Sequence, residues 1–270
     1  QGGANLACEG EDLQLNANIT GGMEPYIVNW TGPNGFTSTQ QNPVITNVTP
    51  AAMGNYQVTV HDSYGCTPQT RTLNVTINPA PTATVTGGGG YCQFAGSPFI
   101  WFTAVGGTPP FTFEYNLDGG PTQTITTFGI STSAFIFAPT NITGSFTYNL
   151  TNVSDDNGCS RAISSSTTVV VNALPSAYIT GDWVVCPGSD NIYTGNSGME
   201  NYDWSVSGNG SIPVASSLQN VSVTAGDLCS QPYNVLLMVT DGNGCNATAE
   251  ELVLVEDIVN PVITGSIPLT

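Results

Sequence analysis

The sequence Asp155-Asp156-Asn157-Gly158-Cys159 recurs, in variant form, at residues 62–66 and again at residues 241–245. In each stretch an aspartate stands four residues before a cysteine, and a glycine stands directly before that cysteine. This spacing is typical of a tight turn, because the carboxylate accepts backbone N–H groups and glycine adopts a positive φ. We call each stretch an aspartate turn, and their recurrence predicts a chain built from repeats.

A second cysteine opens each repeat, and we call Cys8, Cys92 and Cys186 the opening cysteines. Each of them follows a glycine by five positions. Between an opening cysteine and the next aspartate turn stands a large aromatic residue, which is Trp30, Tyr115 or Trp204. The period is roughly 90 residues, the size of one β-sandwich domain.

The sequence between these landmarks predicts β-strands. Leu13, Leu15 and Ala17 alternate with polar residues, the period of two expected of a half-buried strand. Linkers that contain proline, at residues 78–81 and 172–175, separate the repeats. We therefore expect an all-β chain of three tandem antiparallel β-sandwiches in an extended rod, with repeats at residues 1–78, 79–172 and 173–257.

These motifs resemble the immunoglobulin-like and PKD-like (HYR-type) tandem repeats of large bacterial cell-surface proteins, above all the adhesin-type repeats exported by the type IX pathway. In the first repeat the resemblance is carried by Cys8, Gly21-Gly22 with Pro25-Tyr26, Trp30, Gly54-Asn55-Tyr56 and the aspartate turn at 62–66. The resemblance covers residues 3–256 and implies an extended, multi-domain protein that is secreted or attached to a cell surface.

Pairing the two landmark cysteines of each repeat joins Cys8 to Cys66 and Cys92 to Cys159. The third repeat contains a further cysteine, so three pairings are open there. Analogy favours Cys186 with Cys245, which leaves Cys229 unpaired or alternatively paired, either as a buried thiol or in an intermolecular bridge. Zinc is not expected, because no Cys-x-x-Cys occurs and the chain has one histidine.

The charge of the chain excludes several partners. It contains 2 basic and 19 acidic residues, a formal net charge of −17, and both basic residues are arginine. Such a chain has no basic surface for nucleic acid or for an anionic membrane. No apolar run approaches the ~18 residues of a membrane span, so we expect no membrane insertion. The cysteines and the absence of lysine favour an extracellular or cell-surface location.

The sequence offers little for catalysis. His61-Asp62-Ser63 contains the residue types of a catalytic triad, but neighbours on a strand point to opposite faces. The acidic pair Asp155-Asp156 would need a facing carboxyl group across a cleft to act as a glycosidase. We therefore expect a protein that is not an enzyme and has no cofactor.

Two groups of residues have competing interpretations. Asp155, Asp156 and Asn157 offer oxygen ligands for calcium, although the turn role described above is favoured. Phe99-Ile100-Trp101-Phe102 is too apolar for all of its side chains to face one core, so Phe99, Trp101 and Phe102 indicate either an interface or deep burial. For Trp30 and Trp204 we expect core packing.

The leading functional hypothesis is a structural or adhesive rod or fibre on a bacterial cell surface. The alternative is a secreted carbohydrate-binding β-sandwich module that uses exposed aromatic residues such as Trp101. The expected partners are other copies of the chain or neighbouring repeats of the same polypeptide, together with surface glycans.

Residues 258–270 predict either the first strand of a fourth repeat or a donor strand. Their Thr264-Gly265 matches Thr86-Gly87 and Thr180-Gly181, which end the opening strands of the second and third repeats. If this segment completed the first repeat of another molecule, head-to-tail filaments would form by strand addition. The alternative is that residues 1–270 are one window of a longer repeat array. The predicted assembly strand consists of Val259, Asn260, Pro261, Val262, Ile263 and Thr264.

Overall fold

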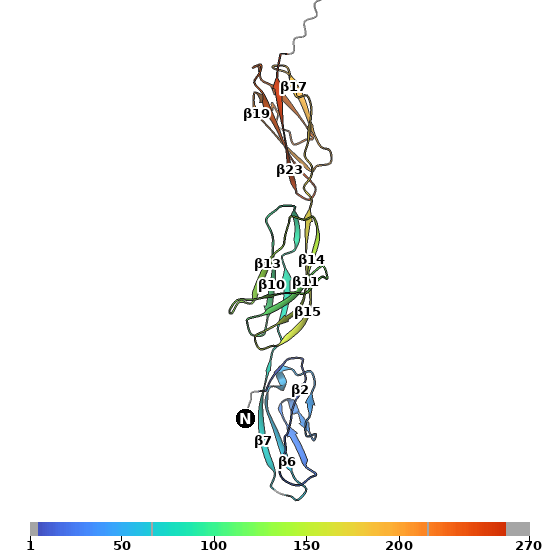
Figure 1. The fold of residues 1–270 in the computed structure, drawn as a ribbon, viewed down its shortest axis with the longest axis vertical. Helices are drawn as coiled ribbons and strands as arrows, with labels where there is room; N and C mark the ends of the chain where they lie inside the picture. The colour runs from blue at the N-terminus through green and yellow to red at the C-terminus, as the bar shows by residue number, and fades with distance from the viewer. Residues whose placement is uncertain (1–4, 66, 215, 258–270) are drawn as a thin grey trace, which may run out of the picture. The chain divides into compact units, whose positions relative to one another are not determined.

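A computed structural model describes residues 5–65, 67–214 and 216–257 (Figure 1). These residues form six β-sheets arranged as three β-sandwiches, which confirms the predicted all-β fold. Apart from the short 3-10 turns η1 (Pro33–Gly35) and η2 (Pro50–Ala52), this part of the chain contains no helix. None of the residues described forms a helix that is long and apolar enough to cross a membrane.

The first sandwich has a five-stranded sheet in the order β1-β7-β6-β3-β4 and a two-stranded sheet, β2-β5. β1 runs parallel to β7, with Ala7 opposite Ile77. The other pairs are antiparallel. The strands are β1 (Asn5–Cys8), β2 (Leu13–Gln14), β3 (Ile27–Thr31), β4 (Thr37–Ser38), β5 (Val44–Ile45), β6 (Gly54–His61) and β7 (Gln69–Asn78).

The second sandwich has a three-stranded sheet in the order β13-β10-β8 and a five-stranded sheet in the order β12-β11-β14-β15-β9. β8 is an edge strand and runs antiparallel to β10, with Thr86 opposite Trp101. The strands are β8 (Thr82–Thr86), β9 (Gly89–Cys92), β10 (Phe99–Val105), β11 (Thr112–Leu117), β12 (Gln123–Thr126), β13 (Ser133–Phe137), β14 (Gly144–Ser154) and β15 (Ser160–Asn172).

The third sandwich has two four-stranded sheets, in the orders β16-β18-β21-β20 and β17-β23-β22-β19. The short strand β17, which leads into Cys186, is parallel to the last strand β23, with Val185 opposite Val255, as β1 is to β7 in the first sandwich. The strands are β16 (Ile179–Thr180), β17 (Val184–Val185), β18 (Asp190–Gly195), β19 (Asn201–Gly208), β20 (Gly210–Ser211), β21 (Asn220–Ala225), β22 (Tyr233–Thr240) and β23 (Asn246–Val255).

Each sandwich buries the inward-facing half of its alternating strands. Trp30, Tyr115 and Trp204 are all buried, so the predicted core role of the two tryptophans is confirmed. Trp30 Nε1 donates to the carbonyl oxygen of Gln41 at 3.3 Å, and Trp204 Nε1 donates to that of Leu218 at 3.0 Å. Each indole thus satisfies its one polar atom at an equivalent place in its sandwich.

Contacts among residues divide the chain into two compact units. The first unit takes in the first sandwich and most of the second. The second unit takes in the third sandwich together with residues 90–96 and 139–144. The repeat boundaries and the extended rod stay predictions, and the predicted strand within residues 258–270 lies outside the described residues.

Candidate functional site: linked turns, an open edge and an aromatic face

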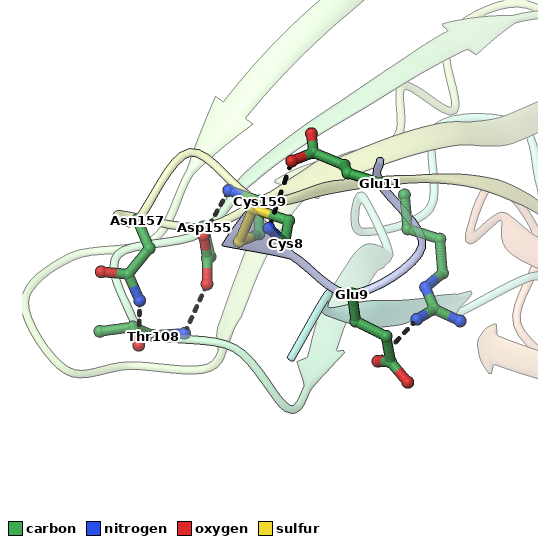
Figure 2. Close-up of a disulfide and its surroundings, with 8 residues drawn as sticks. Cys8, Glu9, Glu11, Thr108, Asp155, Asn157 and Cys159 are labelled. Carbon is green, nitrogen blue, oxygen red and sulfur yellow. Dashed lines mark hydrogen bonds and ion pairs between the residues drawn. A yellow bond between two sulfur atoms is a disulfide. The ribbon is translucent and has the colours of Figure 1, made fainter. Parts of the chain in front are cut away.

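The aspartate turn at residues 155–159 is held together by its own side chains. Asp155 is buried, and its two carboxylate oxygens accept the backbone N–H groups of Cys159 and Thr108, each at 2.9 Å. Asn157 Nδ2 donates to Thr108 Oγ1 at 2.8 Å (Figure 2). The turn therefore fixes the direction of the Cys159 side chain.

Gly107 explains why the Gly-Gly motif accompanies this turn. Its φ is 71°, in the left-handed region that favours glycine. A Cβ atom at this position would lie 2.9 Å from Asp155 Oδ2, closer than carbon and oxygen pack. The absence of a side chain at Gly107 therefore lets Asp155 reach the backbone N–H of Thr108.

Cys8 lies in a second kind of turn, Cys8–Glu11, which we call an opening turn. Glu11 N donates to Cys8 O at 3.1 Å, and Gly10 N donates to Val48 O at 2.8 Å. Glu11 also accepts the N–H of Cys8 through Oε2 at 3.2 Å. These bonds hold Cys8 beside the end of β7, where Asn78 is its opposite residue.

A disulfide joins these two turns. Cys8 bonds to Cys159 with a Cα–Cα distance of 5.4 Å, and both residues are buried (Figure 2). The predicted pairing of Cys8 with Cys66 is therefore wrong. The bridge links the first sandwich to the second instead of closing one repeat on itself.

The second disulfide has the same design. Cys92, in the opening turn Cys92–Ala95, bonds to Cys245 of the aspartate turn between β22 and β23, with a Cα–Cα distance of 5.5 Å. Asp241 Oδ1 accepts the N–H of Cys245 at 2.9 Å, as Asp155 does for Cys159. The predicted pairings of Cys92 with Cys159 and of Cys186 with Cys245 are therefore also wrong.

Strand length explains why a repeat does not close on itself. The opening cysteine of a repeat lies beside the end of its last strand, whereas the aspartate turn comes just before that strand begins. The last strand of the second sandwich, β15, has 13 residues. A strand of this length spans ~40 Å, and a disulfide needs Cα atoms within ~7 Å.

Two further cysteines are free and exposed: Cys186, in the opening turn of the third sandwich, and Cys229. The prediction that Cys186 is paired is therefore wrong, and of the two alternatives for Cys229 the structure has the unpaired one. Cys66 lies outside the described residues.

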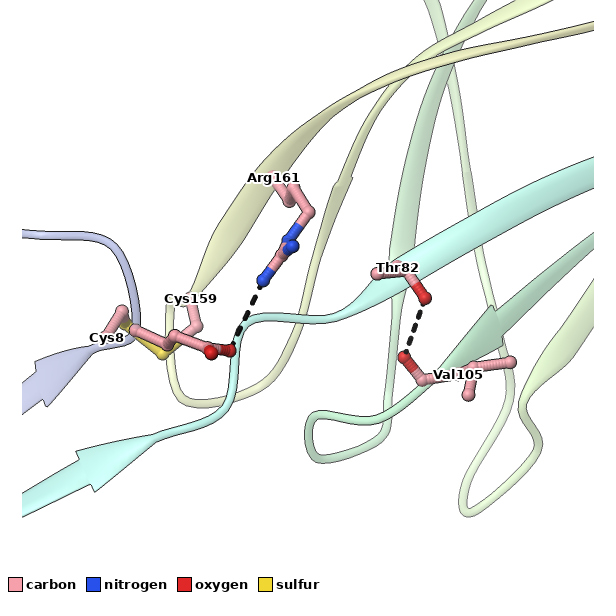
Figure 3. Close-up of polar contacts among 6 residues, drawn as sticks. Cys8, Thr82, Val105, Cys159 and Arg161 are labelled. Carbon is pink, nitrogen blue, oxygen red and sulfur yellow. Dashed lines mark hydrogen bonds and ion pairs between the residues drawn. A yellow bond between two sulfur atoms is a disulfide. The ribbon is translucent and has the colours of Figure 1, made fainter. Parts of the chain in front are cut away.

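An ion pair lies beside the Cys8–Cys159 bridge (Figure 3). Arg161 Nη2 and Glu9 Oε2 form an ion pair at 3.3 Å, with the Arg161 side chain exposed and the Glu9 side chain partly exposed. Nearby, Thr82 at the start of β8 donates through Oγ1 to the carbonyl oxygen of Val105 at 3.4 Å. This contact lies at the edge of the second sandwich that β8 closes.

The calcium interpretation gains no support from the geometry around Asp155. Its two oxygens accept backbone N–H groups, and Asn157 uses its amide on Thr108. Among the described residues, no group of three or more His, Cys, Asp or Glu side chains is arranged to hold a metal ion.

His61, Asp62 and Ser63 form a strand end and a turn. His61 ends β6, opposite Ile27. Ser63 Oγ donates to the carbonyl oxygens of Met23 at 3.3 Å and Glu24 at 3.2 Å, so its hydroxyl serves the turn.

Four aromatic side chains share the outer face of β10 and β13. Phe99 lies opposite Phe137 and Trp101 opposite Phe135, and their exposed fractions range from 41% to 60%. The ring centroids are 4.8 Å apart in the first pair and 4.9 Å in the second. We call this set the aromatic face.

Phe99, Trp101 and Phe102 of β10 do not share one environment in the structure. Phe102 points inward, is fully buried and packs against Phe113 and Tyr115, so the interface interpretation is wrong for it. Alternation along β10 leaves Phe99 and Trp101 outside. Phe135 and Phe137 were missed, although the alternating stretch Phe135-Ile136-Phe137 carries the same signal.

The first sandwich has an open edge at residues 16–20. Counted from the Gly-Gly motif, these residues correspond to 101–105 in β10, which pairs with β8. Among the described residues, no strand pairs with 16–20 on the side where β8 would lie. On the other side, Leu15 N donates to Pro43 O at 2.9 Å and Ala17 N to Asn42 Oδ1 at 3.0 Å.

A cleft of about 670 Å³ lies along this edge. Its lining includes Ala17, Ile19, Val58 and Val60. Val60 stands two residues before its aspartate turn and is half-buried, whereas Val153, at the same place in the second repeat, is fully buried. The core of the first sandwich is therefore partly uncovered where the second sandwich has β8.

No family model matches the chain, and no curated protein matches its sequence. Solved structures match it by fold. A titin I-band fragment of three immunoglobulin domains is 14% identical with a TM-score of 0.50, and the match covers 94% of this chain and 96% of the fragment. A bacterial ice-binding adhesin fragment is 13% identical with a TM-score of 0.48, over 93% and 94% of the two chains. The likeness to titin shows the fold, and the chain is a tandem array of immunoglobulin-like β-sandwiches.

Proposed function

We propose that this chain is a structural, adhesive-type segment of an extracellular bacterial surface protein, whose sandwiches form a rod that withstands tension. The observation that carries the proposal is the overlap of the two disulfides along the sequence. One spans Cys8 to Cys159 and the other spans Cys92 to Cys245, so each bridge begins or ends inside the other.

The overlap gives the chain a second covalent route. At every backbone position between Cys8 and Cys245 at least one disulfide spans the chain, so a single cut leaves the two parts joined. Tension applied to the ends passes directly from Cys8 to Cys159. From Cys159 two covalent routes lead to Cys245, one directly along the chain and one through the second disulfide. The second route is shorter, because it follows the chain back to Cys92 and crosses the bridge to Cys245. Most of the chain is shielded from extension.

Force spectroscopy of the chain held by its ends tests this role. In oxidised protein the extension between Cys8 and Cys245 is limited by the stretch from Cys92 to Cys159. This stretch is about 70 residues long and allows about 230 Å. After reduction about 240 residues can extend, which allows about 800 Å. Equal extension before and after reduction would contradict the proposal.

The rod would extend by head-to-tail contact between copies. We assign the open edge at residues 16–20 as the acceptor and residues 259–264 of a second copy as the donor strand. β8 shows what such a strand requires, since its Ala83 and Val85 are buried and its threonines are exposed. Counted from the Thr-Gly that ends each strand, Pro261 and Ile263 take the places of Ala83 and Val85.

Light-scattering mass tests the head-to-tail contact. We expect residues 1–270 to assemble and a version ending at Glu256 to be monomeric. Ile263→Asp should prevent assembly, because it places a charge in the cleft, whereas Val262→Asp on the outward face should not. Assembly of the shortened chain, or equal behaviour of the two variants, would rule out this donor strand.

The aromatic face supports a second candidate function, carbohydrate binding. Trp101 and its three aromatic neighbours offer exposed rings on a rigid pair of strands, a surface that suits sugar stacking. A glycan array followed by titration calorimetry tests it. We expect Trp101→Ala to abolish binding, while Phe128→Ala, which removes an exposed ring from the loop after β12, leaves it unchanged. An array without hits would remove this candidate.

A further inference from the structure

The opening turn of the third sandwich matches the two turns that carry disulfides. Ser189 N donates to Cys186 O at 3.2 Å, and the corresponding bonds at Cys8 and Cys92 measure 3.1 and 3.0 Å. Gly188 N donates to Gly226 O at 3.3 Å, and the corresponding bonds measure 2.8 and 2.9 Å. The backbone therefore presents Cys186 as it presents the other two opening cysteines.

The backbone angles agree with the hydrogen bonds. The residue two positions after the opening cysteine has a positive φ in every turn: 91° at Gly10, 64° at Phe94 and 69° at Gly188. A phenylalanine rarely adopts this conformation, so its presence shows that the turn geometry is imposed by the fold. Two of these turns hold a disulfide, and the third holds a free, exposed thiol.

The partner of each opening cysteine follows one rule. Cys8 of the first sandwich bonds to the aspartate turn of the second, and Cys92 bonds to the aspartate turn of the third. Applied to Cys186, the rule requires an aspartate turn on the sandwich that follows the third. Under the proposed head-to-tail contact, that sandwich is the first sandwich of another copy.

The first sandwich carries such a turn. Gly65 N donates to Asp62 O at 3.4 Å, and the same bond in the turns of Asp155 and Asp241 measures 3.0 Å. The glycine φ values are 76°, 80° and 78° at Gly65, Gly158 and Gly244. The residue that follows Gly65 is Cys66, at the sequence position of the two cysteines that accept a bridge.

We propose that Cys186 forms a disulfide with the aspartate-turn cysteine of a second copy, and that this bond locks the head-to-tail contact covalently. The inference rests on the proposed function, because it needs the second copy to dock first. Within the chain, a disulfide of this kind joins each sandwich to the next. The proposed bond is the same kind of bridge between two copies. A filament built this way has a continuous second covalent route.

The bond forms by thiol–disulfide exchange with a small-molecule disulfide such as oxidised glutathione. The Cys186 thiolate attacks the S–S bond of glutathione, forms a mixed disulfide and releases one glutathione thiolate. The thiolate of the aspartate-turn cysteine then attacks the Cys186 sulfur and releases the second. Two protein thiols lose two protons and two electrons, and one glutathione disulfide becomes two thiols.

Non-reducing gel electrophoresis of the assembled chain in a glutathione redox buffer tests the lock. Wild type and Cys229→Ser should give a ladder of covalent multimers that reduction collapses to one band. Cys186→Ser and Cys66→Ser should give no ladder, although light scattering still shows non-covalent assemblies. Cys229 is the matched control, since it is also a free, exposed cysteine. Peptide mapping should find Cys186 joined to Cys66.

The outcomes separate the two proposals. Assembly in which Cys186 stays open to iodoacetamide, or in which two Cys186 residues join each other, overturns the lock and leaves the head-to-tail contact standing. Absence of assembly by light scattering under oxidising and reducing conditions overturns the head-to-tail contact and the lock together.

Discussion

The first and second sandwiches are built from the same repeat but differ at one edge. In the second, β8 pairs with β10, Val85 fills the core and Val153 is fully buried. In the first, residues 16–20 have no described strand beside them on that side, and Val60 is half-buried. Within the described part of the chain, the other strands of the first sandwich form without this neighbour, so the strand is a separable part whose contribution is to cover the core.

The largest loss of stability should come from a substitution in β8, an edge strand of the second sandwich. Val85→Asp puts an unpaired charge into the core and should lower the free energy of unfolding of that sandwich by about 4–5 kcal/mol. Hydrogen exchange across β10 and β13 measures it sandwich by sandwich. The first sandwich should be unaffected.

Thr84→Asp is the control for that variant, since Thr84 lies on the same strand with its side chain exposed. It should change the free energy of unfolding by less than about 0.5 kcal/mol. If the two variants lowered the free energy of unfolding by similar amounts, β8 would contribute through its backbone pairing alone. Burial of Val85 would then not explain the difference between the two sandwiches.

Removing a bridge should lower the free energy of unfolding by a similar amount and should separate the effect of the edge from that of the disulfide. The two disulfides enclose 151 and 153 residues, so the chain-entropy model gives them nearly equal contributions, about 5 kcal/mol each. We expect Cys8→Ser with Cys159→Ser to lower the urea midpoint of the first sandwich by the same amount as Cys92→Ser with Cys245→Ser lowers that of the second. A markedly larger loss in the first sandwich would mean that its open edge depends on the bridge.

The sequence predicted the parts of this design that are local. Alternation identified the strands, and spacing identified Trp30 and Trp204 as core residues and Asp155 as a turn residue. Each of these depends on neighbours within one repeat, where side-chain direction follows from position along a strand.

The disulfide partners could not be predicted in the same way, because all repeats carry the same two landmark cysteines. Pairing within a repeat and pairing with the next repeat fit the spacing of Cys8 and Cys92 equally well. The deciding quantity is the length of the last strand, which separates the opening cysteine from the aspartate turn of its own repeat. Residues 160–172 read as one uninterrupted Ser-, Thr- and Val-rich strand, and that length was the signal that argued against closure within the repeat.

A smaller effect measures how far the core of the first sandwich is uncovered. Val153→Ala should cost about 2–3 kcal/mol, because the residue is fully buried, and Val60→Ala about 1 kcal/mol, because part of its surface is already in water. Urea unfolding gives both values. In the presence of a peptide of residues 258–266, Val60→Ala should lower the free energy of unfolding by more than it does without the peptide. The effect of Val153→Ala should not change. An equal cost at both sites without peptide would mean that the cleft does not weaken the core.

The smallest effect concerns the residue after the opening cysteine. Glu9 pairs with Arg161 at 3.3 Å, whereas Gln93 at the same place donates through Nε2 to Asn141 O at 3.1 Å. Glu9→Gln gives the first opening turn the residue of the second. Since the Glu9 and Arg161 side chains are 33% and 42% exposed, water screens the pair, and the loss should stay below about 0.5 kcal/mol and vanish in high salt. A loss that exceeds 1 kcal/mol and persists in high salt would show that the ion pair orients the Cys8–Cys159 bridge, and that the two bridges hold their sandwiches by different means.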